Sequence, residues 1–398
     1  MTYIIDAVRT PIGNFGGTLK NIRTDDLAAI PIRELIKRTN IDPNKIDDVI
    51  LGCANQAGED NRNVARMASL LAGIPYTVPG ETVNRLCASG MSAVIHAHRA
   101  AISKDGNLFI SGGVENMTRG PWVISKVSKA FGRDAQMHDS SFGWRFINPK
   151  MKELYGTDGM GQTAENLAEK YNITREDQDL FAFNSQRKAS RAQERGRFKD
   201  EIVSVKIPQK KGDPIIFDKD EFIRPNTSLE VLAKLKPAFK KNGSVTAGNA
   251  SGLNDGAAAM LLASENGVKE NNLVPIAKIV SSAVVGVEPK IMGIGPVEAS
   301  FKALKKAKLK MSNIDIIELN EAFAVQSLAC IREWGLNDDD PRINPNGGSI
   351  ALGHPLGVSG TRIIHSAALE LQKQNKKYAL ITMCIGVGQG YATIIEKI

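Results

Sequence analysis

Two of the four cysteines of this chain stand where a sulfur could react. Cys87 lies in ETVNRLCASGMS, just before small residues that open a helical pattern, so the positive end of a helix would favour its thiolate. Cys384 ends a strand pattern and precedes IGVGQG, whose backbone N–H groups could bind an oxyanion. The first cysteine is therefore a candidate nucleophile and the second a candidate acid–base group. Considered alone, either cysteine could equally well be a buried residue that only packs against its neighbours.

A histidine and an asparagine are candidates to assist these thiols. His354 lies in NPNGGSIALGHPLGVSG, where glycines allow close backbone approach and Pro355 stiffens the turn. A neutral imidazole there could accept a thiol proton or donate to an oxyanion. Asn320 ends DIIELN and could hold a water or polarise a carbonyl, although it could also cap the next helix. Cys53 and Cys330 are assigned to packing, and the other four histidines to structural or solvated positions.

Strand and helix patterns that alternate along the chain must position these side chains. Such alternation predicts an α/β fold with a parallel sheet, and ligand sites in such folds gather at the C-terminal ends of the strands. The expected strands are 3–8, 47–52, 107–113, 258–264, 276–285, 315–320, 378–384 and 391–398. The expected helices are 24–38, 61–73, 90–103, 296–308, 321–334 and 360–373.

The chain also repeats itself weakly. NKIDDVILGCANQ parallels SNIDIIELNEAFA, ASGMSAVIHAHRAA parallels VSGTRIIHSAALEL, and NLFISGGVE parallels KYALITMCIG, in order and at nearly constant offset. These matches predict one α/β unit used twice. The stretch 115–245 has fewer strand-like runs and reads as an inserted loop domain. We therefore expect an N-terminal half at 1–114 plus 246–275 and a C-terminal half at 276–398.

Composition limits the partners that the protein can have. The net charge is +8, but the lysines are spread out and no basic run is interleaved with aromatic residues, so we expect no nucleic-acid partner. A positive field would also steer a phosphorylated small ligand. No apolar run approaches the roughly 18 residues of a membrane span, and the N-terminus does not resemble a secretory signal. We expect a cytoplasmic protein that does not bind a membrane.

Five stretches together resemble the thiolase family. They are VNRLCASGMSAV, TAGNASGLNDGAAAML, ELNEAFAVQ, NPNGGSIALGHPLGVSGTR and MCIGVGQG, in this order and at similar spacing. The resemblance covers nearly the whole chain from DAVRTPIG onward. It implies duplicated α/β halves that form a layered α-β-α-β-α core with an inserted loop domain. It also implies cleavage of a 3-oxoacyl-CoA by CoA, or the reverse condensation, with ping-pong kinetics.

The resemblance also implies roles for individual residues. Cys87 would be the nucleophile that becomes acylated, and His354 would accept its proton and then hold a thioester oxygen. Cys384 would donate a proton to the enolate carbon, and Asn320 would hold a water in one oxyanion hole. The backbone N–H groups of Cys87 and Gly386 would form the other hole. These residue types suit carbon–carbon cleavage beside a ketone.

The remaining expectations concern coenzyme A and assembly. Coenzyme A would be a substrate, with no tightly bound cofactor and no metal, and acyl-CoA and CoA would be the partners. The resemblance further implies a homo-oligomer, either a dimer or a tetramer. The positions that match CoA-contacting or pocket-lining residues are Ser251, Arg224, Phe239, Ala247, Met160 and Phe323.

The substrate and two rival functions stay open at this point. FGWRFINPKMKELYG and GLNDDDPRINPNGG look more like thiolases of the 3-oxoadipyl-CoA type, and Arg145 is a candidate partner for a terminal carboxylate. An acetoacetyl-CoA thiolase is the alternative. A decarboxylating ketoacyl synthase would place a histidine where Cys384 stands. A non-catalytic acyl-CoA or lipid carrier on the same scaffold would not need the intact set of reactive residues.

Overall fold

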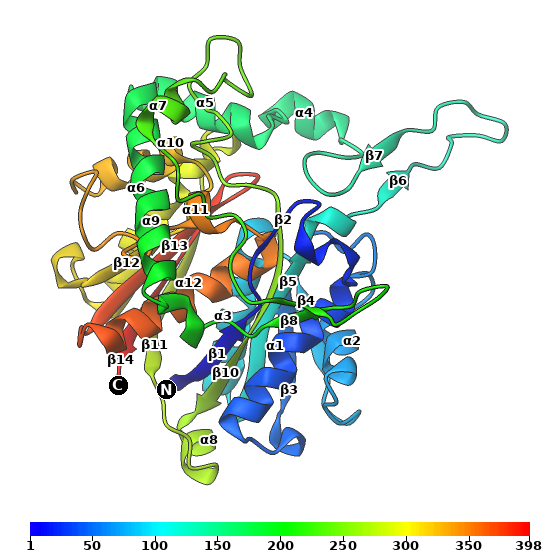
Figure 1. Ribbon diagram of the computed structural model, residues 1–398, viewed down its shortest axis with the longest axis vertical. Coiled ribbons are helices and arrows are strands. Elements are labelled where there is room, and N and C mark those ends of the chain that lie inside the picture. Colours follow the sequence, from blue (N-terminus) through cyan, green and yellow to red (C-terminus); the bar gives the residue numbers. More distant parts are fainter.

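The computed structural model describes all 398 residues, and its core is one mixed sheet of ten strands (Figure 1). The small strand β2 (Gly13–Asn14) pairs with β10. The other strands, in spatial order, are β12 (Ile316–Leu319), β13 (Tyr378–Ile385), β14 (Gln389–Lys397), β11 (Ala277–Gly286), β1 (Thr2–Arg9), β10 (Asn254–Ser264), β5 (Leu108–Asn116), β3 (Asp48–Gly52) and β4 (Gly80–Val83).

All eight expected strands are present, but the expected parallel sheet is wrong. Only the pairs β3–β4, β3–β5 and β12–β13 are parallel, and every other pair in the sheet is antiparallel. One cause is that β13 and β14 are joined by a three-residue turn, 386–388, which forces a hairpin. Alternation of strands and helices does not report strand direction, whereas the turn residues of IGVGQG do.

The helices form three layers around the two halves of the sheet. The outer helices α1 (Thr24–Thr39) and α2 (Val64–Leu71) share a core with β3, β5 and β10. On the opposite side, α9 (Gly295–Ala307) and α10 (Ala324–Glu333) share a core with β12, β13 and β14. The helices α3 (Ser89–Ser103) and α12 (Leu356–Lys373) lie between the halves in the largest core. The layered α-β-α-β-α arrangement is therefore present, and each expected helix is found.

The two middle helices approach each other backbone to backbone. A Cβ on Gly90 of α3 would lie 2.4 Å from the carbonyl oxygen of Gly357, and a Cβ on Gly360 of α12 would lie 2.3 Å from the backbone nitrogen of Met91. No side chain fits in such a gap. The glycines thus set how closely the N-terminal turns of α3 and α12 meet, and two candidate site residues, Cys87 and His354, lie just before those turns.

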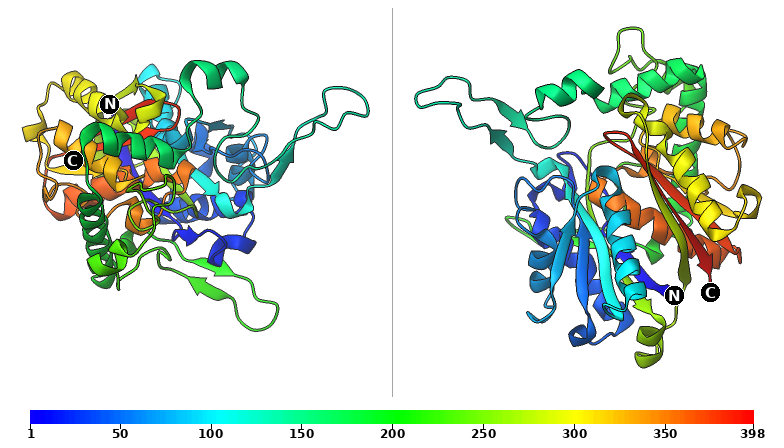
Figure 2. Two further views of the ribbon diagram at one scale, coloured as in Figure 1. Left: turned by 90° about the horizontal axis from the view of Figure 1, so that it is seen from above. Right: turned by 180° about the vertical axis from the view of Figure 1, so that it is seen from behind.

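The duplication expected from the sequence is visible in the topology. The three repeated stretches fall on β3 and β12, on α3 and α12, and on β5 and β13. The spatial order of strands on one side of the β1–β11 junction repeats on the other. That junction is short, because only Tyr3 pairs with Lys278 and Ile4 with Ala277. Figure 2 shows the two sets of strands side by side, blue to cyan and olive to red.

The chain leaves the sheet after Asn116 and rejoins it at Asn254. We propose that 115–245 is a separate loop domain. Its paired strands β6 and β7 belong to a segment that projects far from the body (Figures 1 and 2). No helix of the protein has both the length and the apolarity to cross a bilayer. The elements of the insertion are β6 (Trp122–Ile124), β7 (Met137–Asp139), α4 (Pro149–Tyr155), α5 (Met160–Tyr171), α6 (Arg175–Glu194), β8 (Val205–Ile207), β9 (Ile215–Phe217) and α7 (Leu229–Ala233). Two short helices outside it are α8 (Glu265–Glu270) and α11 (Ser349–Leu352).

Candidate active site

One cavity of about 690 Å³ brings together residues from the two halves and the insertion. Its size is that of a typical small-molecule site, and its lining is mostly apolar. The lining includes all three candidate reactive side chains and all six expected CoA or pocket contacts: Cys87, His354, Cys384, Ser251, Arg224, Phe239, Ala247, Met160 and Phe323. Asn320 and Gly386 are not among the lining residues, but each interacts with one that is.

Cys87 lies in a tight 3-10 turn, Leu86–Ala88, between β4 and α3. Leu86 has a φ of 47°, a left-handed conformation that costs a leucine free energy. Ser89 braces the turn, because its hydroxyl donates to the Leu86 carbonyl (2.7 Å) and accepts from the Arg85 N–H (2.9 Å). The hydrogen bonds of Ser89 therefore offset the cost of the strained turn, and the turn holds the thiol of Cys87 at the cavity wall.

The electrostatics of Cys87 differ from the sequence-based expectation. Burial raises the pKa of its thiol to about 11, although hydrogen bonding from the backbone N–H groups of Gly386 and of Cys87 itself acts in the opposite direction. The helix start therefore does not suffice to make a thiolate at neutral pH, and a base is needed. The same two N–H groups converge on the sulfur, so the oxygen of an acyl group attached to that sulfur would also lie within their reach.

His354 is fixed in one orientation between α11 and α12. Its backbone N–H donates to Asn254 Oδ1 (2.9 Å), and its Nδ1 lies 2.6 Å from the hydroxyl of Ser359. That hydroxyl donates to the Pro355 carbonyl (3.1 Å), so it accepts from Nδ1–H and leaves Nε2 with a free lone pair. Burial, with a contribution from the charge of Arg362, lowers the pKa of His354 to about 3. A neutral imidazole with Nε2 open is the form that can accept a proton.

Asn320 stands behind this imidazole. Its Nδ2 lies 3.4 Å from His354 Nε2, and its Oδ1 accepts a 2.6 Å hydrogen bond from Ser349. Its backbone N–H donates to the carbonyl of Thr382 in β13 (3.0 Å). The alternative role as a helix cap does not apply, because α10 begins at Ala324 with Phe323 before it. The side-chain N–H group of Asn320 therefore points toward Nε2 of the His354 imidazole.

Cys384 is fully buried near the end of β13 and lines the same cavity. Burial raises the pKa of its thiol well above the usual value, and repulsion from the Cys87 thiolate adds to this. The two sulfurs are thus close enough for their charges to interact. A protonated Cys384 thiol beside the nucleophile can act as an acid, and only one of the two thiols will readily ionise at a time.

Most of the remaining cavity lining is apolar, and it holds a single cation. The rings of Phe239 and Phe323 meet edge to face, with centroids 6.3 Å apart. Arg224 is the only arginine or lysine in the lining, which holds no carboxylate, and its guanidinium lies 5.5 Å from the ring centre of Phe222. Such a surface suits a long apolar arm that ends in negative charge.

Arg145, the candidate partner for a substrate carboxylate, does not line the cavity. Its guanidinium instead donates to the backbone carbonyls of Ser140 (3.2 Å) and Asn55 (3.4 Å). The structure does not support that assignment.

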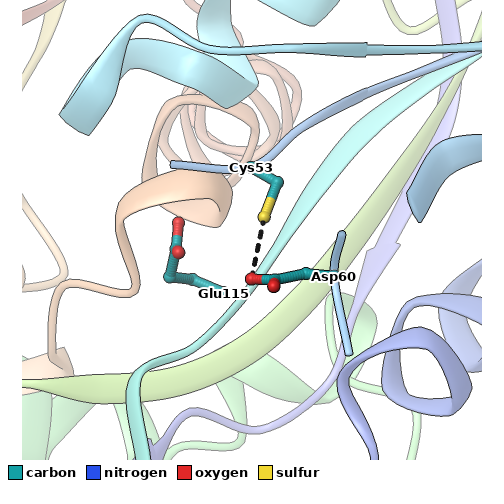
Figure 3. A group of neighbouring side chains, drawn as sticks. All are labelled: Cys53, Asp60 and Glu115. Carbon is teal, nitrogen blue, oxygen red and sulfur yellow. Dashed lines mark hydrogen bonds between the residues drawn. The ribbon is translucent and has the colours of Figure 1, made fainter. Parts of the chain in front are cut away.

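Cys53 and Cys330 are buried, as expected for packed cysteines. Cys53 is also part of a cluster with Asp60 and Glu115 (Figure 3), whose ligand atoms all lie within 4.8 Å of one another. Both carboxylates already accept backbone N–H bonds, and Glu115 binds Ala54, Asn55 and Gly357 in this way. Because Gly357 lies in the first turn of α12, this cluster ties the loop after β3 to the segment that follows the site histidine.

Sequence reasoning missed the groups that support the site. Ser359 and Ser349 orient the histidine and the asparagine, and the backbone of Leu86 is strained. The two serines lie inside the stretch quoted for His354, but a serine type alone carries no positional signal. Their roles depend on side-chain contacts that only the folded chain defines.

Known proteins of one family resemble this chain over nearly its whole length. Family models described as "Thiolase, N-terminal domain" and "Thiolase, C-terminal domain" match residues 2–266 and 273–397. The chain is 56% identical over 397 residues to a beta-ketoadipyl-CoA thiolase of Acinetobacter baylyi, covering 100% of this chain and 99% of the relative. A 3-oxoadipyl-CoA/3-oxo-5,6-dehydrosuberyl-CoA thiolase of Escherichia coli is 56% identical with the same coverage.

A solved structure agrees with these matches. The crystal structure of the Bacillus anthracis acetyl-CoA acetyltransferase superposes with a TM-score of 0.93 at 42% identity, covering 100% of this chain and 98% of that one. With family models that match nearly the whole length and relatives above half identity, the chain belongs to the thiolase family of acyltransferases.

Proposed function

We propose that this thiolase cleaves 3-oxoadipyl-CoA with CoA, through an acyl intermediate on Cys87. The observation that carries the mechanism is one cavity lined by Cys87, His354 and Cys384. The 56% identity to relatives named for 3-oxoadipyl-CoA and beta-ketoadipyl-CoA supports the substrate class. Coenzyme A enters as a substrate, and we propose no tightly bound cofactor.

In the first half-reaction, His354 Nε2 accepts the thiol proton of Cys87 as its sulfur attacks the 3-oxo carbon. The backbone N–H groups of Cys87 and Gly386 stabilise the resulting oxyanion. When the oxyanion collapses, the bond between C2 and C3 breaks and its electrons pass to C2 as an enolate. Cys384 donates its proton to C2, which releases acetyl-CoA and leaves an acyl-Cys87 thioester. The enolate oxygen is held by His354 and by a water on Asn320.

In the second half-reaction, the Cys384 thiolate takes the proton of the incoming CoA thiol. The CoA sulfur attacks the thioester, and Cys87 leaves and recovers its proton from His354. The sum is one 3-oxoacyl-CoA and one CoA consumed, and one acetyl-CoA plus one shortened acyl-CoA formed. Each thiol ends in its starting state. Because acetyl-CoA leaves before CoA reacts with the acyl-Cys87 intermediate, the kinetics are ping-pong.

The experiment for the mechanism is intact-mass measurement after mixing the enzyme with 3-oxoadipyl-CoA without CoA. One acyl adduct is expected on Cys87, absent in Cys87→Ala, with release of one acetyl-CoA. An enzyme that binds the substrate but forms no adduct would support a carrier function instead. For the substrate, kcat/KM for 3-oxoadipyl-CoA should exceed that for acetoacetyl-CoA, and the reverse ranking would favour an acetoacetyl-CoA thiolase.

We propose that the apolar arm of the cavity binds CoA through Ser251, Phe239, Ala247, Met160 and Phe323. Arg224 is the charged group available for the phosphate end, in keeping with the single cation of the lining. The overall positive charge would assist the approach of this anionic substrate.

We also propose a cytoplasmic homo-oligomer, a dimer or a tetramer. The projecting segment around β6 and β7 supports this, since Trp122, Ile124, Phe131 and Met137 are more than half exposed there. Exposed apolar patches on a soluble chain commonly mark protein contacts. Trp122→Ser combined with Phe131→Ser should lower the mass measured by light scattering, and an unchanged mass would contradict this use of the segment.

A further inference from the structure

A chain of buried hydrogen bonds runs behind the site to Asn320. Arg362 Nη2 lies 3.3 Å from the hydroxyl oxygen of Ser349, and this hydroxyl lies 2.6 Å from Asn320 Oδ1. All three side chains are at most 2% exposed. A guanidinium can only donate, so the serine oxygen accepts from Arg362 and its proton goes to Asn320 Oδ1. The chain of bonds therefore has one direction.

This direction decides which side of the Asn320 amide faces the imidazole. With Oδ1 held by Ser349, Nδ2 points to His354 Nε2, whose lone pair is free because Nδ1–H is bonded to Ser359. A flipped amide would set its oxygen against that lone pair and leave the Ser349 proton without an acceptor. Two acceptors facing each other in a buried site are unfavourable.

We propose that Ser349 and Arg362 are positioning residues, which hold the Asn320 amide with its N–H side toward His354 and the cavity. The proposal rests on the proposed function, in which Asn320 and His354 stabilise the enolate oxygen. One further observation places the charge of Arg362 near the site, because this charge contributes to lowering the pKa of His354.

The test is a double-mutant cycle in the full-length enzyme, with kcat and KM of thiolysis measured for each variant. Asn320→Ala should lower kcat about 100-fold, as the loss of one oxyanion donor does. Ser349→Ala should lower kcat about 10- to 100-fold through misorientation, with KM for CoA unchanged. The double variant should be no slower than Asn320→Ala alone, because the serine acts only through the asparagine. Ser349→Thr, which keeps the hydroxyl, should recover activity.

The matched control is Ser300→Ala. Ser300 is equally buried on α9 with an unpartnered hydroxyl, and its loss should leave kcat unchanged. For Arg362, the variant Arg362→Lys keeps the charge but shortens the donor. It should lower kcat on its own and cause no further loss in the Ser349→Ala background, with the folded fraction of each variant measured by circular dichroism.

The outcomes distinguish the role of Asn320 in catalysis from the positioning role of Ser349 and Arg362. If Asn320→Ala keeps wild-type kcat, the proposed role of Asn320 fails and the positioning role fails with it. If Asn320→Ala is slow but Ser349→Ala is not, or if their effects multiply in the double variant, the positioning role alone is overturned. A multiplied effect of Arg362→Lys and Ser349→Ala overturns the part assigned to Arg362.

Discussion

Replacing Gly113 by alanine should inactivate the enzyme, although Gly113 does not line the cavity. Gly113 lies on β5, and a Cβ there would stand 1.9 Å from the carbonyl oxygen of Gly357 in the first turn of α12. Ordinary contact begins at 3.4 Å, so the added atom is about 1.5 Å too close. The strand is paired on both sides, by β10 and β3, and cannot retreat without breaking its ladders. The start of α12 must therefore move.

That movement reaches the site, since Gly357 follows His354 by three residues. A displacement of about 1 Å in a reacting group can cost about 100-fold in rate, so kcat of Gly113→Ala should fall about 100-fold or more. Overpacking should also lower the free energy of unfolding by about 1–3 kcal/mol. The assays are thiolysis, followed by the enolate absorbance of the 3-oxoacyl-CoA, and urea unfolding followed by circular dichroism.

A neighbouring glycine provides the control. Gly256 on β10 is paired with Glu115, two residues after Gly113 on β5. Its Cβ would meet Pro355 at 3.5 Å, which is ordinary contact. Gly256→Ala should leave kcat and the unfolding midpoint close to wild type. Wild-type kcat in Gly113→Ala, or equal losses in both variants, would refute the reasoning that close approach of β5 and α12 sets the histidine.

Three further predictions concern charge and proton state. Because burial lowers the pKa of His354 to about 3, the pH profile of kcat/KM for the 3-oxoacyl-CoA should show no inflection near 6.5; an inflection there that His354→Asn removes would contradict this. Burial raises the pKa of Glu318 to about 8. The folded state thus holds an extra proton between about pH 4.5 and 8, and its stability falls as pH rises through this window. Glu318→Gln should lose less stability across the same window in urea titrations, and parallel curves would contradict the assignment. Arg224→Ala should raise the KM for CoA with little change in kcat, whereas a lower kcat at unchanged KM would show that the arginine does not serve binding.

The sequence predicted those structural features that depend only on residue type and on neighbours along the chain. Val- and Ile-rich runs predicted the strands of the sheet, and the repeated stretches predicted its duplication, because burial on both faces leaves a clear pattern. Cys87 and Cys384, nearly three hundred positions apart, could be paired only through the resemblance to a family. No periodicity reports which loops of two halves meet at one cavity.

Other properties depend on solvent access and on contacts that a linear pattern does not contain. The helix start at Cys87 predicted an easily ionised thiol, but the loss of water around the sulfur outweighs the backbone donors. Arg145 is basic and lies near the right motif, yet its guanidinium is bonded to backbone carbonyls elsewhere. The strand directions followed from a short turn, and not from the hydrophobic pattern of the strands.

The short junction between β1 and β11 has a consequence for how the protein loses activity. With two residue pairs joining the sheet there, cohesion between the halves depends on the packing of α12 against α3 and β5. The nucleophile belongs to one half, and its base and acid belong to the other. Mild denaturant that loosens this contact would inactivate the enzyme while each half keeps its helices and strands. The rate of turnover should therefore report the association of the halves more sensitively than circular dichroism does.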